Sequence, residues 1–82
     1  MLRTFTYMEI YENLDKFEYT RRYEIAFDPG QVASISKRKW NVCGWGGLVN
    51  YEGCYVTLKN GRGYLLVGKS DEIYKSIVGT EH

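Results

Sequence analysis

The residues best suited to contact another molecule are concentrated in one stretch, KRKWNVCGWGG, from Lys37 to Gly47. Three consecutive cations are followed directly by Trp40, and a second tryptophan, Trp45, lies among glycines. Cations next to an aromatic ring are typical of single-stranded nucleic-acid binders, in which the cations contact phosphates and the rings stack on bases. The alternative is structural: in a small domain a tryptophan folds back to cover the core, and the lysines extend into water.

The glycines of this stretch favour a contact role, because they add flexibility that a purely structural segment does not need. We therefore expect 37–47 to be an exposed loop. A second candidate surface is a tyrosine-rich sheet face with neighbouring arginines, the residue types that dominate hot spots in protein interfaces; its alternative is an ordinary half-buried face. The predicted partner-binding residues are Lys37, Arg38, Lys39, Trp40, Trp45, Tyr51, Arg21 and Arg22.

The residues needed for most enzymatic chemistry are missing from the sequence. The one histidine is the last residue, His82, so a Ser-His-Asp or Cys-His site is not expected. Cys43 and Cys54 with one terminal histidine do not make a standard zinc site. The GxG within 43–47 lacks a third glycine and a surrounding βαβ unit, so it does not predict a phosphate loop. We expect no enzymatic activity, no metal and no cofactor.

Length and charge restrict the remaining functions. The 82 residues are enough for one domain, 1–82, and the net charge of +1 gives no general attraction to nucleic acid or anionic membrane. No signal peptide or membrane-spanning segment is recognisable, which predicts a cytoplasmic protein with free thiols. A disulfide between the two cysteines is the alternative if the chain is exported.

The N-terminal third predicts a β-hairpin. Residues 4–11 are rich in β-branched and aromatic side chains, and 17–27 alternate with a period of two residues. Asn13 to Lys16 suits the turn between them. A helix is the competing interpretation for the first segment, because Ile10, Leu14 and Phe17 fall at helical spacing.

The second half predicts three further elements, after a stop at Asp28-Pro29-Gly30 and a short strand, VASIS. Asn60-Gly61 is a strong hairpin signal, and a two-residue turn there places Val56 opposite Leu65. Alternation then puts one set of residues on the core face: Cys54, Val56, Leu58, Leu65 and Val67. The segment DEIYKSIV predicts a short helix with Ser70 as its N-cap and Gly79 at its end. The predicted fold is α+β: a small antiparallel sheet of about five strands with one short C-terminal helix packed on it.

From Phe27 onward the order of these motifs resembles small bacterial FlbD-like proteins. The shared features are the VASI strand, the TLKNG hairpin and the KSDEI helix start. They cover about half of the chain and are interrupted by 37–53, and no function is carried over from them. In size, tyrosine content and lack of catalytic residues, the chain also resembles phage-encoded inhibitors of host proteins, which would act in the host cytoplasm.

These observations favour a non-enzymatic protein-binding module, a phage-type inhibitor or adaptor acting through the 37–47 segment and an aromatic sheet face. The partner is expected to be another protein or a second copy of the chain, forming a homodimer, and no membrane contact is expected. The alternative function is binding of single-stranded nucleic acid or a nucleotide through Lys37–Trp40.

Overall fold

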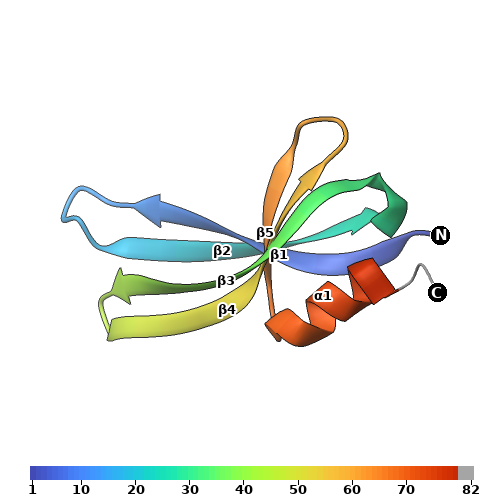
Figure 1. The fold of residues 1–82 in the computed structure, drawn as a ribbon. Helices are drawn as coiled ribbons and strands as arrows, with labels where there is room; N and C mark the ends of the chain where they lie inside the picture. The colour runs from blue at the N-terminus through green and yellow to red at the C-terminus, as the bar shows by residue number, and fades with distance from the viewer. Residues whose placement is uncertain (80–82) are drawn as a thin grey trace.

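The computed structural model describes residues 1–79 and has one sheet and one helix (Figure 1). All five strands pair antiparallel in the order β2-β1-β5-β4-β3. The predicted α+β fold of five strands and a C-terminal helix is therefore confirmed. The elements in chain order are β1 (Arg3–Glu12), β2 (Glu18–Phe27), the 3₁₀ helix η1 (Pro29–Gln31), β3 (Val32–Gly44), β4 (Gly47–Leu58), β5 (Gly63–Val67) and α1 (Ser70–Val78).

The first hairpin forms as the alternating pattern predicts. β1 and β2 pair along their whole length, from Arg3 opposite Phe27 to Glu12 opposite Glu18. The side chain of Asn13 organises the turn, since its Oδ1 accepts hydrogen bonds from the backbone N–H groups of residues 15 and 17. The helical interpretation of the first segment is wrong. This segment forms strand β1, and the side chains of both β1 and β2 alternate between the two faces of the sheet.

The segment Lys37–Gly47 is not a flexible loop, which corrects the expectation from its glycines. β3 continues to Gly44 and β4 begins at Gly47, so that only two residues form the turn between them. Cross-strand apolar pairs explain this extension: Trp40 lies opposite Tyr51, and residue 42 lies opposite residue 49, both valines. The glycines are confined to the tip of a long hairpin.

The hairpin between β4 and β5 is present, but its register differs by one residue from the prediction. Thr57 pairs with Gly63 and residue 56 with Tyr64. The turn holds three residues instead of two: the N–H of Gly61 donates to the carbonyl of Leu58, and Gly61 has a positive φ of 90°. A one-residue shift reverses the faces of a strand, so Leu66 is buried where 65 and 67 were expected.

The helix covers one face of the sheet and closes the main core there. Phe27, Val56, Leu58, Leu66 and Ile77 form the buried cluster, with partly buried side chains around it. The predicted stripe of the helix is confirmed, since residue 77 is buried and residue 73 packs against the cluster. Two further apolar side chains, Met8 and Val42, are buried outside this cluster. Alternation places them on the opposite face of the sheet.

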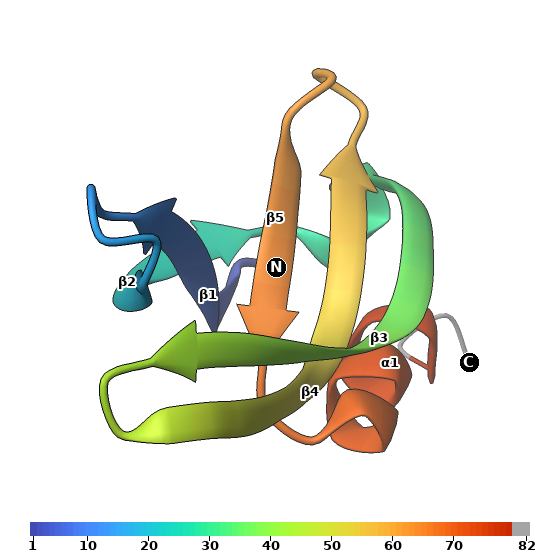
Figure 2. The ribbon, with the colours of Figure 1, turned by 90° about the vertical axis from the view of Figure 1, so that its left-hand side faces the viewer.

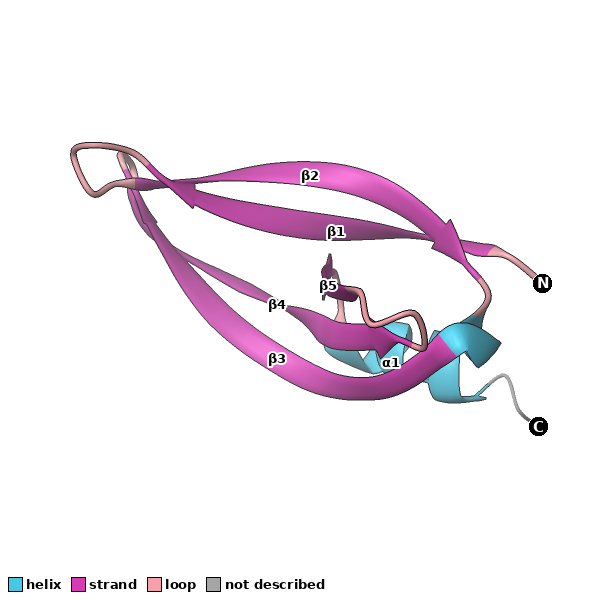
Figure 3. Ribbon diagram, turned by 90° about the horizontal axis from the view of Figure 1, so that it is seen from above, coloured by secondary structure: helices cyan, strands magenta, loops and turns pink. Residues whose placement is uncertain are grey.

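A sharp bend in β4 gives the molecule its elongated form. Figure 2 shows β4 running alongside β5 and then turning away to continue with β3. Gly53 lies where β4 leaves β5, opposite Val67 in the last pair of their register, and a Cβ atom there would lie 1.8 Å from the carbonyl oxygen of Leu66. Seen from above, the β1–β2 and β3–β4 hairpins converge at their tips (Figure 3). The molecule measures 46 × 23 × 17 Å.

The N-terminus of α1 is capped by a side chain from the sheet, which corrects the predicted cap. The cap position is Lys69, whose side chain makes no capping bond, and Ser70 is the first helical residue. The carboxylate of Glu52 accepts the Ser70 backbone N–H at 3.1 Å and its hydroxyl at 2.9 Å. These bonds satisfy a free helical N–H and place a negative charge at the positive end of the helix. Gly79 ends the helix with right-handed angles.

Candidate functional site

The eight predicted contact residues do not form one site, because alternation along β3 sends them to different faces. Trp45 lies at the tip of the β3–β4 hairpin. Lys37 and Lys39 point to the helix side, opposite Cys54 and Glu52 in the register. The face away from the helix carries Arg38, Trp40, Tyr51 and Arg22, and the tyrosine-rich face of the first hairpin carries Arg21.

The two long hairpins meet at a largely apolar end that we call the tip surface, formed by Leu14, Phe17, Trp45 and Leu48. The ring of Phe17 stacks on the indole of Trp45 with a centroid distance of 4.8 Å. Leu14, Trp45 and Leu48 are nonetheless 103%, 79% and 64% exposed. Exposed apolar side chains gathered in one place mark interaction sites more often than scattered ones do.

A hydrogen bond reinforces the contact between the tips. The Glu18 carboxylate accepts the backbone N–H of Cys43 at 3.1 Å, so β2 and β3 are joined although they are the two edges of the sheet. Trp45 is therefore held between two hairpins on a fixed ring partner. A preformed aromatic side chain loses little conformational entropy when a partner covers it.

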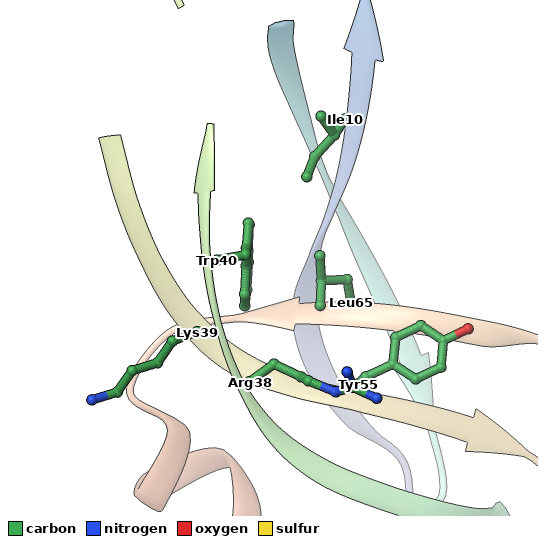
Figure 4. Close-up of a pocket in the computed structure, with 6 residues that line it drawn as sticks. All are labelled: Ile10, Arg38, Lys39, Trp40, Tyr55 and Leu65. Carbon is green, nitrogen blue, oxygen red and sulfur yellow. The ribbon is translucent and has the colours of Figure 1, made fainter. Parts of the chain in front are cut away.

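The face away from the helix holds a cleft of about 340 Å³. Four apolar or aromatic side chains and one guanidinium line it: Ile10 from β1, Leu65 from β5, Tyr55 from β4, and Trp40 and Arg38 from β3 (Figure 4). Lys39 also borders the cleft, but its side chain points away from the other five in Figure 4.

Trp40 is the central wall of this cleft and is half-buried. Its ring stacks on Tyr51 with a centroid distance of 6.1 Å. The guanidinium of Arg22, from β2, lies 5.8 Å from the centre of the Tyr51 ring. The indole Nε1 of Trp40 is buried and has no hydrogen-bond partner within the described chain. Packing alone therefore fixes this ring.

The two lysines on the helix side are close to acidic groups. Nζ of Lys37 lies 2.6 Å from Oδ1 of Asp71 and 5.2 Å from the centre of the Tyr74 ring. The hydrogen bond raises the pKa of Lys37 and lowers the pKa of Asp71. Lys39 lies opposite Glu52, whose pKa is lowered chiefly by its hydrogen bonds from Ser70. The ion pair of Lys37 therefore supports the attachment of the helix.

The tyrosine-rich face is a continuous set of ring contacts along the first hairpin. Tyr7 stacks on Tyr23 at 5.3 Å, Tyr11 stacks on Tyr19 at 5.2 Å, and Tyr64 meets the Tyr7 ring edge-on. The hydroxyl of Tyr11 donates to the Glu9 carboxylate, and this bond raises the tyrosine pKa. These rings come from the neighbouring strands β1, β2 and β5: Tyr7, Tyr11 and Tyr64 are half-buried, whereas Tyr19 and Tyr23 are exposed.

Most of the apolar residues of the tip surface and of the cleft were not predicted from the sequence. Leu14 and Leu48 belong to the tip surface, and Ile10 and Leu65 line the cleft. A signal was present for the first two, because each is an apolar residue within or directly beside a predicted turn, where polar residues are usual. The cleft gave no such signal, since it depends on the bend of β4.

Both cysteines are free: Cys43 is exposed, and Cys54 is buried beneath the helix side, where desolvation raises its pKa. Within residues 1–79 no group of three His, Cys, Asp or Glu side chains is arranged to hold a metal ion. The described part of the chain contains no helix long and apolar enough to cross a membrane. His82 lies outside the described residues.

Comparisons with protein-family models, with curated proteins and with solved structures found no match to this chain. The likeness to FlbD-like proteins and to phage inhibitors therefore stays a prediction.

Proposed function

We propose that this protein is a non-enzymatic binding module that contacts another protein through the tip surface. The observation that carries the proposal is Trp45, which is 79% exposed although the Phe17 ring holds one of its faces. Tryptophan is among the residue types enriched at interface hot spots, which lie in well-packed pockets ringed by contacts that exclude water. Leu14 and Leu48 are further exposed apolar residues at the ends of the same two hairpins.

The proposed mode of action is occlusion or bridging. An elongated molecule with an apolar end can insert that end into an apolar pocket of a partner and cover the partner's surface, as an inhibitor or adaptor does. A phage origin and action in a host cytoplasm fit this mode and remain part of the proposal. A second copy of the chain is the alternative partner, because a net charge of +1 provides little repulsion between copies.

Nucleic-acid binding is the less favoured function for a specific reason. The expected site needed the cations and Trp40 on one surface. Of the three cations, Arg38 alone shares the face of Trp40; Lys37 and Lys39 point to the helix side, where Lys37 pairs with Asp71, and Tyr51 covers one face of the Trp40 ring. The protein-partner proposal does not depend on these cations.

Affinity capture from the native host with three matched baits tests the proposal. The baits are the wild type, Trp45→Ala and Glu72→Ala, the last an exposed position on the helix. Support is a protein captured by wild type and Glu72→Ala and lost with Trp45→Ala. Capture of the same proteins by all three baits would contradict the proposal.

Two further measurements separate the other partners. Sedimentation of the purified protein detects a second copy, and dissociation of a dimer by Trp45→Ala would assign the tip surface to self-association. Binding to neutral lipid vesicles that depends on Trp45 would instead make the tip a membrane contact and overturn the proposal, since exposed Trp and Leu also suit a membrane interface.

A further inference from the structure

The cleft on the face away from the helix combines an apolar floor with a guanidinium group. Ile10, Leu65 and Trp40 provide the apolar contacts, and Arg38 and Tyr55 lie beside them (Figure 4). A volume of about 340 Å³ is within the range of ligand-binding clefts. It is large enough for one bulky side chain and part of its backbone.

Arg38 has no acidic partner among the described residues. Its Nε donates to Oγ of Ser36 at 3.1 Å, and its guanidinium carbon lies 6.0 Å from the centre of the Tyr55 ring. No carboxylate lines the cleft within residues 1–79. This differs from the helix side, where Lys37 is already paired with Asp71.

A second guanidinium lies on the other side of Trp40. Trp40 stacks on Tyr51, and Arg22 lies over the Tyr51 ring, again without an ion pair in the described part of the chain. Arg38 is two residues from Trp40 on the same face of β3. The stack of Trp40 and Tyr51 is therefore bracketed by two guanidinium groups that have no carboxylate partners within residues 1–79.

We propose that this cleft binds an acidic peptide segment of a partner protein, with a bulky apolar side chain against Trp40 and Leu65. Carboxylates on either side of that chain reach Arg38 and Arg22. Arginine favours carboxylates because its planar donors match two carboxylate oxygens. Acids on both sides of an apolar residue describe an internal segment of a chain better than a chain end or a small molecule.

A peptide fits the walls of the cleft better than a nucleic acid does. Single-stranded nucleic acid needs open aromatic faces for base stacking. One face of Trp40 is taken by Tyr51, and aliphatic side chains from Ile10 and Leu65 form much of the remaining wall. This site is separate from the tip surface, so either can fail without the other.

Trp40 provides a direct reporter for the test. Trp45→Phe leaves Trp40 as the only tryptophan of the chain, and its fluorescence is followed during titration with three peptides. These are acetyl-Glu-Phe-Glu-amide, acetyl-Gln-Phe-Gln-amide and acetyl-Glu-Ala-Glu-amide. Backbone amide NMR shifts of the wild type show independently whether the peptide binds at the cleft.

The Glu-Phe-Glu peptide is expected to bind at least about tenfold more tightly than either of the others. The Gln-Phe-Gln peptide lacks the carboxylates, and the Glu-Ala-Glu peptide lacks the aromatic ring. Its advantage over the Gln-Phe-Gln peptide should fall by about tenfold in Arg38→Gln and persist in Arg62→Gln, a matched control at the β4–β5 turn. Equal affinity for the three peptides, or no change at Trp40, would overturn the proposal. So would binding of an oligothymidylate that responds to Arg38→Gln while the peptides do not bind.

Discussion

The ring of Phe17 stacks on the indole of Trp45 and joins the ends of two hairpins that start on opposite sides of the sheet. The hydrogen bond from Cys43 to Glu18 lies beside this stack. Because the tips are tied together, Trp45 is both exposed and fixed in position. This combination underlies the proposed contact with another protein.

Phe17→Ala is expected to release the two tips from each other. An aromatic pair contributes about 0.5–1.5 kcal/mol beyond its buried area, so the free energy of unfolding should fall by at least that amount. Trp45 should then move faster, which time-resolved fluorescence anisotropy can measure. Leu14→Ala is the control in the same turn, because that side chain is fully exposed and its loss should leave both quantities unchanged. Equal anisotropy decay in Phe17→Ala and wild type would show that the stack does not hold the indole.

Gly53→Ala is expected to be among the most destabilising substitutions in the chain. A Cβ at this position would lie 1.8 Å from the backbone oxygen of Leu66, so β4 and β5 would have to separate at the bend. The free energy of unfolding, measured with urea, should fall by about 3 kcal/mol or more. Gly46→Ala is the matched control, since a Cβ there meets no atom within 4 Å. A change below about 1 kcal/mol in Gly53→Ala would mean that the bend can relax without cost.

Helix α1 is expected to lose its attachment at acidic pH. Hydrogen bonds from Ser70 lower the pKa of Glu52 from its ordinary 4.5, and the Lys37 hydrogen bond lowers the pKa of Asp71 from 3.8. Both carboxylates bind protons more weakly in the folded state. Their stabilisation is therefore complete above these ordinary values and is lost as the pH falls through the lowered ones.

At alkaline pH the folded state is expected to lose stability as the pH rises. The pKa of Lys37 is raised from 10.5, so its stabilisation is complete below that value and is lost as the pH rises through the raised pKa.

Urea unfolding from neutral to acidic pH, followed by circular dichroism, checks the acidic limb. Glu52→Gln should flatten this limb, and Glu72→Gln, on the helix itself, should retain it. An acidic limb of unchanged slope in Glu52→Gln would remove Glu52 from the account.

The pattern of the sequence predicts the strands and the helix well because period and turn residues are local properties. The alternation in 17–27 and the glycine of the Asn60-Gly61 turn both describe short segments. The register of β4 and β5 was wrong because Gly61 adopts its positive φ as the third residue of a longer turn. Turn length depends on how the strands twist, and a dipeptide does not specify it.

The sequence of 37–47 does not predict that its two tryptophans lie at different places on the molecule. Trp40 and Trp45 are five residues apart, yet one lines a cleft and the other occupies a tip. The difference follows from the extension of β3 and from the bend at Gly53, which both depend on contacts far apart in the sequence. The sequence predicts that both tryptophans are exposed, which is right for Trp45 and wrong for the half-buried Trp40, and it does not predict the cleft.

The measurement that tests the central claim most directly compares Trp45→Ala with Trp40→Ala in two assays, urea unfolding and partner capture. Trp45→Ala is expected to lower the free energy of unfolding by no more than about 1.5 kcal/mol, chiefly through the loss of its stack on Phe17, and to abolish capture, because the rest of its side chain is outside the protein. Trp40→Ala should cost about 2–3 kcal/mol, since its ring is half-buried against Tyr51. A loss of stability in Trp45→Ala as large as that in Trp40→Ala, or full capture without the Trp45 indole, would contradict the claim.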